Sequence, residues 1–335
     1  MRKNKTLKLR MNDNKIWLSI IILYTLLFAI RRISMPNTKI SFMNDIYFES
    51  YDNMSSQKET IIYKYDVKTD SVDEIGKVMG YFHNCKIDKE KTVIIGVRSS
   101  FFARSDISDP DANLQFGLVQ YSLENNTSKL LLSETQIRKL NSGRIIWDYS
   151  FPYDNGQKVC ICFLNNEYVF VLYDLGTGSM KKIHLPIIAK VYDIKDNKIW
   201  YSSKGKIMIY DLQTEEKEQL INDRNQCSIS DDNEKIVLLG NISVKHIYLY
   251  DINKKTEKRI LNARWNKTFD CHSSYSSGWD ESGDYFFYIE HFNKFFNSSD
   301  VQIKVYDLRT RRSKCIYSQR NTSAASAYAF IRNMD

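Results

Sequence analysis

Proline and glycine are scarce in this chain, with 4 Pro and 12 Gly among 335 residues. That scarcity excludes a collagen-like chain and argues against a low-complexity, disordered one. The sequence has no C-x-x-C pair, and its 5 His show neither H-x-x-x-H nor H-E-x-x-H spacing, so the usual zinc motifs are missing. It has no P-loop, no G-x-G-x-x-G and no G-x-S-x-G elbow. What it has in abundance is aromatic side chains, 22 Tyr among them, which suit a β-rich globular protein.

Positive charge is concentrated at the N-terminus. The formal net charge is +8, and six Lys or Arg lie within residues 1–15 against one Asp. The remainder of the chain is only slightly basic, which gives little support to nucleic-acid binding. We therefore expect no nucleic-acid partner and no cofactor, and we expect the basic segment 1–15 to meet anionic lipid head groups.

One short pattern recurs six times. Residues 207–221 read I-M-I-Y-D-L-Q-T-E-E-K-E-Q-L-I, which is an alternating apolar run, Tyr-Asp, a polar turn and a second apolar run. Alternation on both sides of a polar turn predicts a β-hairpin. Asp suits the turn because its carboxylate can accept hydrogen bonds from backbone N–H groups just downstream. The copies centre on Tyr65-Asp66, Tyr121-Ser122, Tyr173-Asp174, Tyr210-Asp211, Tyr250-Asp251 and Tyr306-Asp307.

Each copy is preceded by a second hairpin, so the repeating unit has four strands. The shorter intervals between copies approach the roughly 40–45 residues of a propeller blade. We predict an all-β protein: a β-propeller of six four-stranded antiparallel blades within residues 39–317, or of seven if the C-terminal tail, 318–335, pairs with a weak segment. The tail contains A-Y-A-F-I, a candidate ring-closing strand against the first blade. The blades are predicted at residues 39–79, 80–133, 144–185, 188–221, 226–261 and 275–317.

The repeats resemble those of known propellers. S/W-x-D-x-G/N-x-x-I alternates with I-x-Y-D-L-x-T, as in S-I-S-D-D-N-E-K-I followed by I-Y-L-Y-D-I. This alternation is similar to that of the TolB-like and WD40-like propeller families, and it covers most of residues 39–317. Only some blades carry the Gly turn, and the second has Ser122 in place of Asp. The resemblance implies the fold and no particular function, because these motifs build strands and turns.

An apolar run at residues 16–30 ends at Arg31 and Arg32. We predict a transmembrane anchor at 16–32, a linker at 33–38 and a single-pass membrane protein. Fifteen helical residues rise about 22 Å, less than the roughly 30 Å hydrocarbon core, and flanking Lys15 and Arg31 can snorkel. A cleaved signal peptide, which would give a secreted protein, and a buried or interfacial helix remain alternatives. The excess of Lys and Arg before the run predicts a cytoplasmic N-terminus and an extracytoplasmic propeller.

The six Cys are spread over the chain, at about one strand position per blade. This spacing favours packing as small apolar side chains over a disulfide framework, although a bridge such as Cys271–Cys315 remains open. The residues are Cys85, Cys160, Cys162, Cys227, Cys271 and Cys315.

Long insertions are predicted on one face of the propeller. When four strands run outward from the axis, the connections between blades and those between the second and third strands reach the same face. Four insertions fall at such positions, and insertions gathered on one face of a repeat protein often mark its binding surface. They are Ser99–Phe116, Ser133–Gly143, Asn262–Ser274 and His291–Asp300.

Candidate binding residues come from three of these insertions, because exposed aromatic side chains suit contacts with protein or sugar. Each of them taken singly is also a candidate core residue of a strand. They are Phe101, Phe102, Arg104, Trp265, His272, Tyr275, His291, Phe292, Phe295 and Phe296. Asp106, Asp109 and Asp111 are weak candidate ligands for a hard cation, although they lack the spacing of an EF-hand.

The sequence therefore predicts a membrane-anchored, non-enzymatic binding module that docks a protein or a surface glycan through its insertion loops. One alternative is a propeller enzyme, a lyase or hydrolase with a possible metal, using His272, His291 and the acidic loop on the same face. Another is a purely structural propeller inside a larger envelope complex.

Overall fold

In the computed structural model, residues 42–335 form one compact unit, distinct from residues 1–41. The described residues are 44–52, 59–99, 116–140, 147–163, 169–184, 190–222, 226–239, 245–263, 267–269, 277–293, 298–323 and 326–334. They are almost entirely β-strand. No helix among them has the length and apolar character to cross a membrane. The predicted anchor, 16–32, lies outside the described residues.

The strands form antiparallel sheets that follow one another along the chain. Three sheets have four strands from consecutive sequence: β8 (Trp147–Tyr153) to β11 (Met180–His184), β12 (Lys190–Lys195) to β15 (Lys217–Asn222), and β16 (Gln226–Ile229) to β19 (Thr256–Asn262). Within them lie β9 (Lys158–Phe163), β10 (Val169–Asp174), β13 (Lys198–Ser203), β14 (Lys206–Asp211), β17 (Lys235–Leu239) and β18 (His246–Asp251).

The other two sheets depart from this simple order. An eight-stranded sheet runs β3-β2-β1-β25-β4-β5-β6-β7, and a five-stranded one contains β20 to β24. Their strands are β1 (Ile46–Asp52), β2 (Glu59–Asp66), β3 (Ser71–Met79), β4 (Tyr81–Ile87), β5 (Val93–Ser99), β6 (Gly117–Ser122), β7 (Thr127–Ser133), β20 (Lys267–Phe269), β21 (Ser277–Trp279), β22 (Tyr285–Asn293), β23 (Ser298–Asp307), β24 (Arg312–Ser323) and β25 (Ser326–Asn333).

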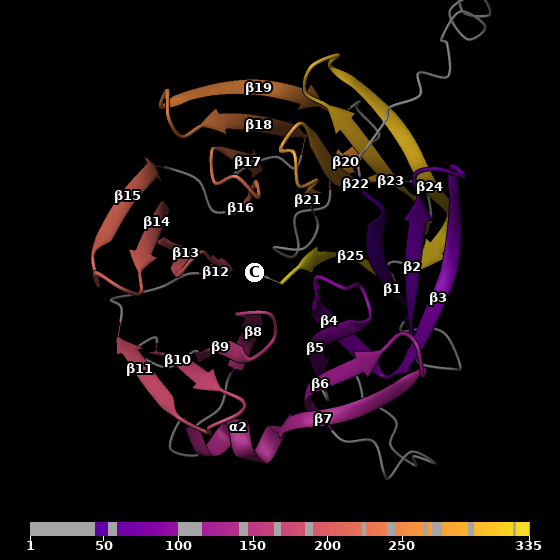
Figure 1. Ribbon diagram of the computed structural model, residues 1–335. Coiled ribbons are helices and arrows are strands. Elements are labelled where there is room, and N and C mark those ends of the chain that lie inside the picture. Colours follow the sequence, from indigo (N-terminus) through magenta and orange to yellow (C-terminus); the bar gives the residue numbers. More distant parts are fainter. Residues whose placement is uncertain are drawn as a thin grey trace, which may run out of the picture. The chain divides into compact units, whose positions relative to one another are not determined.

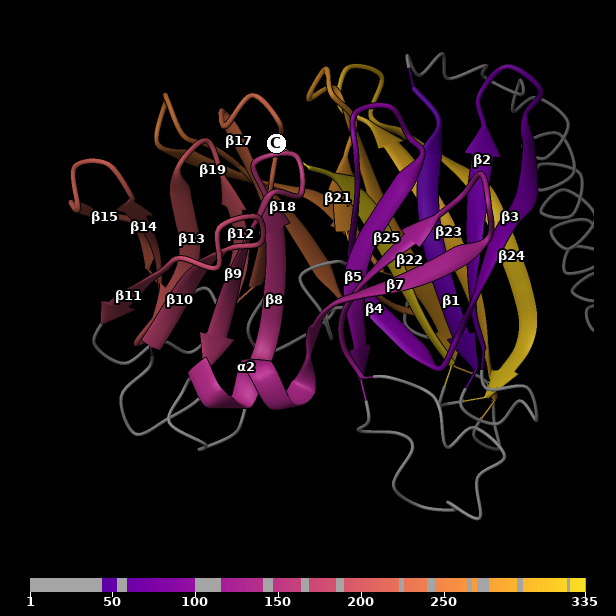
Figure 2. The ribbon, with the colours of Figure 1, turned by 60° about the horizontal axis from the view of Figure 1, so that its bottom comes forward.

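Within residues 42–335 the sheets are arranged around a common axis (Figure 1). The strands nearest the axis include β8, β12 and β25. The tight turns that join first to second and third to fourth strands lie on one side of this ring, for example Asp154–Gln157 and Asp196-Asn197. We call this side the short-turn face (top of Figure 2). The opposite side is the insertion face.

The recurrent Tyr-Asp pair ends the third strand of each group and caps the next turn, as the sequence predicts. In Asp66, Asp174, Asp211 and Asp307 one carboxylate oxygen accepts hydrogen bonds from the N–H groups two and three residues later, at 2.7–3.0 Å. Asp251 accepts one from Lys254, and Ser122 accepts one from Asn125. These bonds hold the pKa of Asp66, Asp174 and Asp211 below its usual value.

The C-terminal strand β25 closes the ring, and it replaces the strand expected at the start of the first blade. It runs antiparallel to β1, from Tyr47↔Ile331 to Asp52↔Ser326, while β1 pairs with β2 on its other side. Residues 39–79 were expected to supply four strands, with the tail as an extra one. Both edges of β1 are occupied, one by β2 and the other by β25. The sequence shows the first hairpin, but only long-range pairing decides its neighbour.

Side chains also tie the last strands to the first. Lys314 of β24 lies 2.5 Å from the carboxylate of Asp70 and donates to the Tyr65 hydroxyl at 3.0 Å, joining the turn after β2. Beside them, the ring of Phe48 packs on those of Tyr63 and Tyr317, with centroids 5.1 and 5.3 Å apart. Closure therefore rests on backbone pairing, an ion pair and aromatic packing together.

Two of the expected insertions contain regular structure. The connection Ser133–Gly143 contains the helix α2 (Glu134–Leu140), and the connection Asn262–Ser274 contains β20, which pairs with β22. A third expectation is wrong: His291 and Phe292 are strand residues of β22, and β23 begins at Ser298, so the expected loop His291–Asp300 is mostly hairpin. Its polar and aromatic residues look like a loop locally, but their partners on β23 extend the ladder.

The described Cys residues divide between packing and exposure. Cys85, Cys160 and Cys162 are buried among apolar side chains, as predicted, whereas Cys315 is exposed. Cys227 and Cys271 lie outside the residues whose side chains are described, so a bridge from Cys271 to Cys315 stays an open prediction.

Glu49 is a buried carboxyl group in β1. Its side chain is 4% exposed, and Oε2 has no hydrogen-bond partner among the described residues. Burial raises its pKa to about 8, opposed only in part by a hydrogen bond from Cys85. The folded protein therefore holds Glu49 protonated at pH values where the unfolded chain ionises it.

We expect this burial to contribute a loss of stability as pH rises, against an opposite contribution from buried His83, whose pKa is lowered to about 4 by burial. Between pH 5 and 7 the unfolded state loses a proton that the folded state keeps, which lowers the free energy of unfolding by about 2–3 kcal/mol. Glu49→Gln should remove that decrease, as measured by urea unfolding across this range. Exposed Glu216→Gln is the control and should leave the pH dependence unchanged. An unchanged decrease in Glu49→Gln would contradict this assignment.

Candidate functional site

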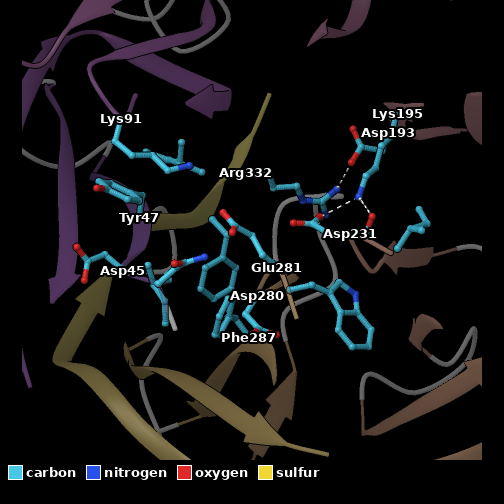
Figure 3. A pocket seen from close by; sticks show the side chains of 17 residues that line it. Asp45, Tyr47, Lys91, Asp193, Lys195, Asp231, Asp280, Glu281, Phe287 and Arg332 are labelled. Carbon is cyan, nitrogen blue, oxygen red and sulfur yellow. Dashed lines mark hydrogen bonds and ion pairs between the residues drawn. The ribbon is translucent and has the colours of Figure 1, made fainter. Parts of the chain in front are cut away.

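A pocket opens near the axis on the short-turn face (Figure 3). Its volume is about 60 Å³. The walls come from the start of β1, the ends of the inner strands β12, β16, β21 and β25, and the turn after β4. We call it the axial pocket, lined by Asn44, Asp45, Ile46, Tyr47, Lys91, Asp193, Lys195, Ile229, Asp231, Gly278, Trp279, Asp280, Glu281, Phe287, Phe330, Ile331 and Arg332.

Asp193 links three inner strands at the base of this pocket. Its two carboxylate oxygens lie 2.8 Å from Lys86 Nζ of β4 and 3.1 Å from an Arg332 guanidinium nitrogen of β25. Lys86, only 1% exposed, also donates to the carbonyl of Ile194 at 3.1 Å. Burial opposes ionisation of Asp193, but these cations outweigh it and hold its pKa below the usual value. The floor of the pocket is thus charged and rigidly paired.

A second ion pair lies at the opening of the axial pocket. Lys195 Nζ lies 3.0 Å from the carboxylate of Asp231 and donates to the Asp231 carbonyl at 2.6 Å. Partial burial raises the pKa of Asp231, and Lys195 only partly offsets this. Across the pocket, burial lowers the pKa of Lys91, against the attraction of Glu281 and Asp88. The carboxylate of Asp231 is therefore easier to protonate, and the ammonium group of Lys91 easier to deprotonate, than the same groups free in water.

Aromatic rings form the remaining wall. Trp279 donates its indole N–H to the Ser228 carbonyl at 3.1 Å, which fixes the ring orientation. Phe287 and Phe330 pack together with centroids 5.8 Å apart, joining β22 to β25. Such a wall offers flat apolar contact beside the charges.

Charges of both signs line the axial pocket. Five are carboxylates and three are cationic, and Lys64 and Lys86, which lie outside the lining and pair with two of the carboxylates, make the numbers equal. Glu281 is exposed at the mouth. A concave, partly aromatic site with an exposed carboxylate at its mouth suits a cationic side chain next to apolar groups.

Most of the residues that the sequence suggested as a site lie outside the described residues. These are Phe101, Phe102, Arg104, Asp106, Asp109, Asp111, Trp265, His272, Tyr275, Phe295 and Phe296. His291 and Phe292 are described and half-buried in β22, away from the axial pocket. Among the described residues, no group of three or more His, Cys, Asp or Glu is placed to hold a metal ion.

Near His291 and Phe292 the structure shows a small charged cluster. Glu290 is 5% exposed, and its Oε2 lies 2.9 Å from Lys267 Nζ and 2.5 Å from Lys304 Nζ. Lys267 also lies 3.7 Å from the centre of the Phe292 ring. This places β20 firmly on the edge of β22, on the insertion-face half of the strand.

The sequence did not predict the axial pocket, because its residues lie in tight turns and at strand ends, where polar residues are expected for structural reasons. Two charged residues in apolar strands could have indicated it. Lys86 in N-C-K-I-D and Asp193 in V-Y-D-I-K interrupt apolar inner strands, where a charge needs a buried partner.

Comparison with known proteins identifies the fold. No protein-family model matches the sequence, and no curated protein is significantly similar to it. Among solved structures, the chain is similar to TolB from Acinetobacter baumannii, with a TM-score of 0.60 and 13% identity over 86% of this chain and 67% of that one. It is also similar to a protein described as putative TolB from Agrobacterium tumefaciens, with a TM-score of 0.53 and 10% identity over 86% of this chain and 99% of that one. The predicted resemblance to TolB-like β-propellers is confirmed as a likeness of fold.

Proposed function

We propose that this protein is a membrane-anchored, non-enzymatic binding module that docks a protein partner at the axial pocket. The partner would place a Lys or Arg side chain in the pocket. We further propose that the propeller has six blades. The described strands support this count, because they fall into six groups of four, with β25 as the innermost strand of the first group and β20 as an addition to the last.

The exposed carboxylate of Glu281 at the mouth of an aromatic-walled pocket carries the proposal. The pocket combines carboxylates with the rings of Tyr47, Trp279 and Phe287. A cationic side chain is attracted by both kinds of group. The ion pairs below it hold the walls in place before a ligand arrives, which lowers the entropic cost of binding.

Membrane attachment is supported by the sequence alone. Residues 16–30 are apolar and flanked by basic residues, and the larger number of Lys and Arg before them favours a cytoplasmic N-terminus. We propose that the propeller lies on the extracytoplasmic side. The partner would then be an extracytoplasmic protein or the exposed segment of a membrane protein.

Photo-cross-linking in cells that naturally make the protein tests the docking site. Benzoylphenylalanine replaces Lys91 at the pocket, and the control places it at exposed Lys129 on the outer strand β7. We expect one partner to be captured from position 91 only, through a peptide that contains Lys or Arg. Glu281→Lys should reduce capture about tenfold, because it replaces an attractive charge with a repulsive one.

Glu216→Lys is the matched control, since it makes the same charge change on an exposed turn of the short-turn face. It should leave capture intact. Equal capture from both positions, or capture that survives Glu281→Lys, would contradict docking at the axial pocket.

A second docking surface, for protein or glycan, remains proposed on the insertion face. The observation that favours it is the contact of Lys267 with Phe292, which places a cation and an aromatic ring at the base of the loops there. Shortening residues 99–116 tests it in the same cross-linking experiment. Loss of the partner in this variant, with capture unchanged in Glu281→Lys, would move the site to the insertion face.

A further inference from the structure

A basic surface lies on two neighbouring turns of the short-turn face. The turn between β18 and β19 and the turn between β23 and β24 belong to successive sheets, and Ile260 and Leu308 from these two hairpins border the same apolar cluster. Seven exposed cationic residues lie on these turns and the first residues of the strands that follow, against one exposed carboxylate, that of Glu257. This basic rim consists of Lys254, Lys255, Lys258, Arg259, Arg309, Arg311 and Arg312.

Most of this charge is not used within the propeller. Lys254 pairs with Asp251, and Arg309 pairs with Asp284 and donates to the Tyr285 hydroxyl. The other five have no ion pair in the described part of the chain. Their charge is therefore available to an external anion.

The turns on either side of the basic rim are acidic. The turn and strand after β14 carry Glu215, Glu216 and Glu218 against Lys217, and those after β2 carry Asp70, Asp73 and Glu74 against Lys68 and Lys77. Among these four neighbouring turns, the excess of positive charge lies on the middle two. A uniform solubilising surface would intersperse both signs.

The chain enters the propeller beside the basic rim. Asp45, just before β1, accepts a hydrogen bond from Val67 N in the turn after β2, so the chain enters on the short-turn face. The same turn holds Asp70, which pairs with Lys314 at the start of β24. Eleven residues, 33–43, separate the predicted anchor from Asn44. Fully extended they span at most about 36–40 Å.

We propose that the basic rim is a membrane-contact surface that binds anionic phospholipid head groups next to the anchor. This membrane-contact proposal rests on the proposed membrane attachment. It adds to that attachment which side of the propeller faces the bilayer. The short tether keeps the rim at high local concentration near the lipid surface. Each basic residue close to anionic head groups strengthens the contact about fivefold. The axial pocket then opens toward the membrane-proximal space, and the insertion face points away.

Lipid-dependent fluorescence quenching tests the contact. Full-length protein is inserted into nanodiscs of phosphatidylcholine, with or without about 30% phosphatidylglycerol as the anionic lipid. A fluorescent amino acid replaces Asn253 in the basic turn or, as a control, Gln213 at the matching position of the acidic turn. Lipids with a spin-labelled head group act as quenchers. We expect strong quenching at 253 only when phosphatidylglycerol is present, and its loss in about 1 M salt, where the Debye length is about 3 Å.

Matched charge variants decide whether the rim is responsible. Replacing Lys255, Arg311 and Arg312 by Gln should weaken the contact about 100-fold. Replacing exposed Lys129, Lys182 and Lys204 by Gln removes the same charge elsewhere and should leave quenching unchanged. Quenching that is equal at 253 and 213, or that survives the first triple variant, would overturn the proposal.

Failure of membrane attachment gives a separate result. If the protein does not insert into nanodiscs, the proposed anchor is wrong, and flotation with phosphatidylglycerol vesicles then tests the rim by itself. Flotation lost in the first triple variant and kept in the second would support the basic rim. No flotation by the unmodified protein would overturn it.

Discussion

Deleting residues 326–335 is expected to unfold the propeller rather than to shorten it. The deletion removes β25, which is the innermost strand beside β1 and is also joined to β4 by parallel pairing. It exposes the edge of β1 and takes away the Met334 N–H that donates to the Ile87 carbonyl at 2.8 Å. The two halves of the eight-stranded sheet therefore lose the strand that joins them.

Buried area sets the size of the effect. Tyr328, Phe330, Ile331 and Met334 are each 2–6% exposed. Burying such a side chain contributes about 1.5–3 kcal/mol, so these four together contribute about 6–12 kcal/mol. That is comparable to the whole stability of a typical domain, about 5–15 kcal/mol. Circular dichroism and urea unfolding of the truncated protein should show no cooperative transition.

A complementation experiment separates loss of closure from general damage. A synthetic peptide of residues 326–335, added in excess to the truncated chain, should restore the cooperative transition in a concentration-dependent way. A point variant, Tyr328→Phe, removes only the hydroxyl that donates to Gln319 and should unfold close to the intact protein. Unfolding of the truncated chain at the urea concentration of the intact one would refute the closing role of β25.

Asp193→Asn is expected to lower the free energy of unfolding by about 3–5 kcal/mol, because it leaves a buried cation without its counter-charge. Lys86 is 1% exposed and has no route to water, and Arg332 loses the same partner. The effect should appear in urea unfolding at neutral pH. Asp231→Asn removes an ion pair whose carboxylate is 37% exposed and should cost no more than about 1 kcal/mol.

Removing the buried cation as well should restore part of the loss. In the double variant Lys86→Met, Asp193→Asn, the ammonium no longer needs a partner, and a positive coupling in the mutant cycle is expected. The pH dependence has a defined sign. The pKa of Asp193 is lowered on folding, so its stabilisation is present above the unfolded value near 4 and is lost as pH falls. An acid transition identical in the intact protein and Asp193→Asn would contradict this.

The local structure of each hairpin was predictable from the sequence. The Tyr-Asp pair ends a strand and caps a turn using only atoms within a few residues, so the same letters give the same structure in every copy. The alternation of apolar residues gave the strands, and their repetition gave the β-propeller, which the likeness to TolB structures bears out. The residue pattern was less informative where a strand carries polar residues. His291 was predicted in a loop and lies in the strand β22.

The sequence offered A-Y-A-F-I of the tail as a closing strand, but only tertiary structure decided that it is the innermost strand beside β1 and that an axial pocket forms there. The pairing of Tyr47 with Ile331 joins residues at opposite ends of the propeller, and no local pattern encodes the choice of that partner over an adjacent strand. The pocket depends on the same closure, because Lys86 and Arg332 become neighbours only when β25 pairs with β4, and Asp193 comes from β12 of another sheet. The sequence shows three charges in apolar strands. That Asp193 pairs with both cations follows only when the ring brings the strand ends to a common axis, since a buried charge is stable only beside its partner.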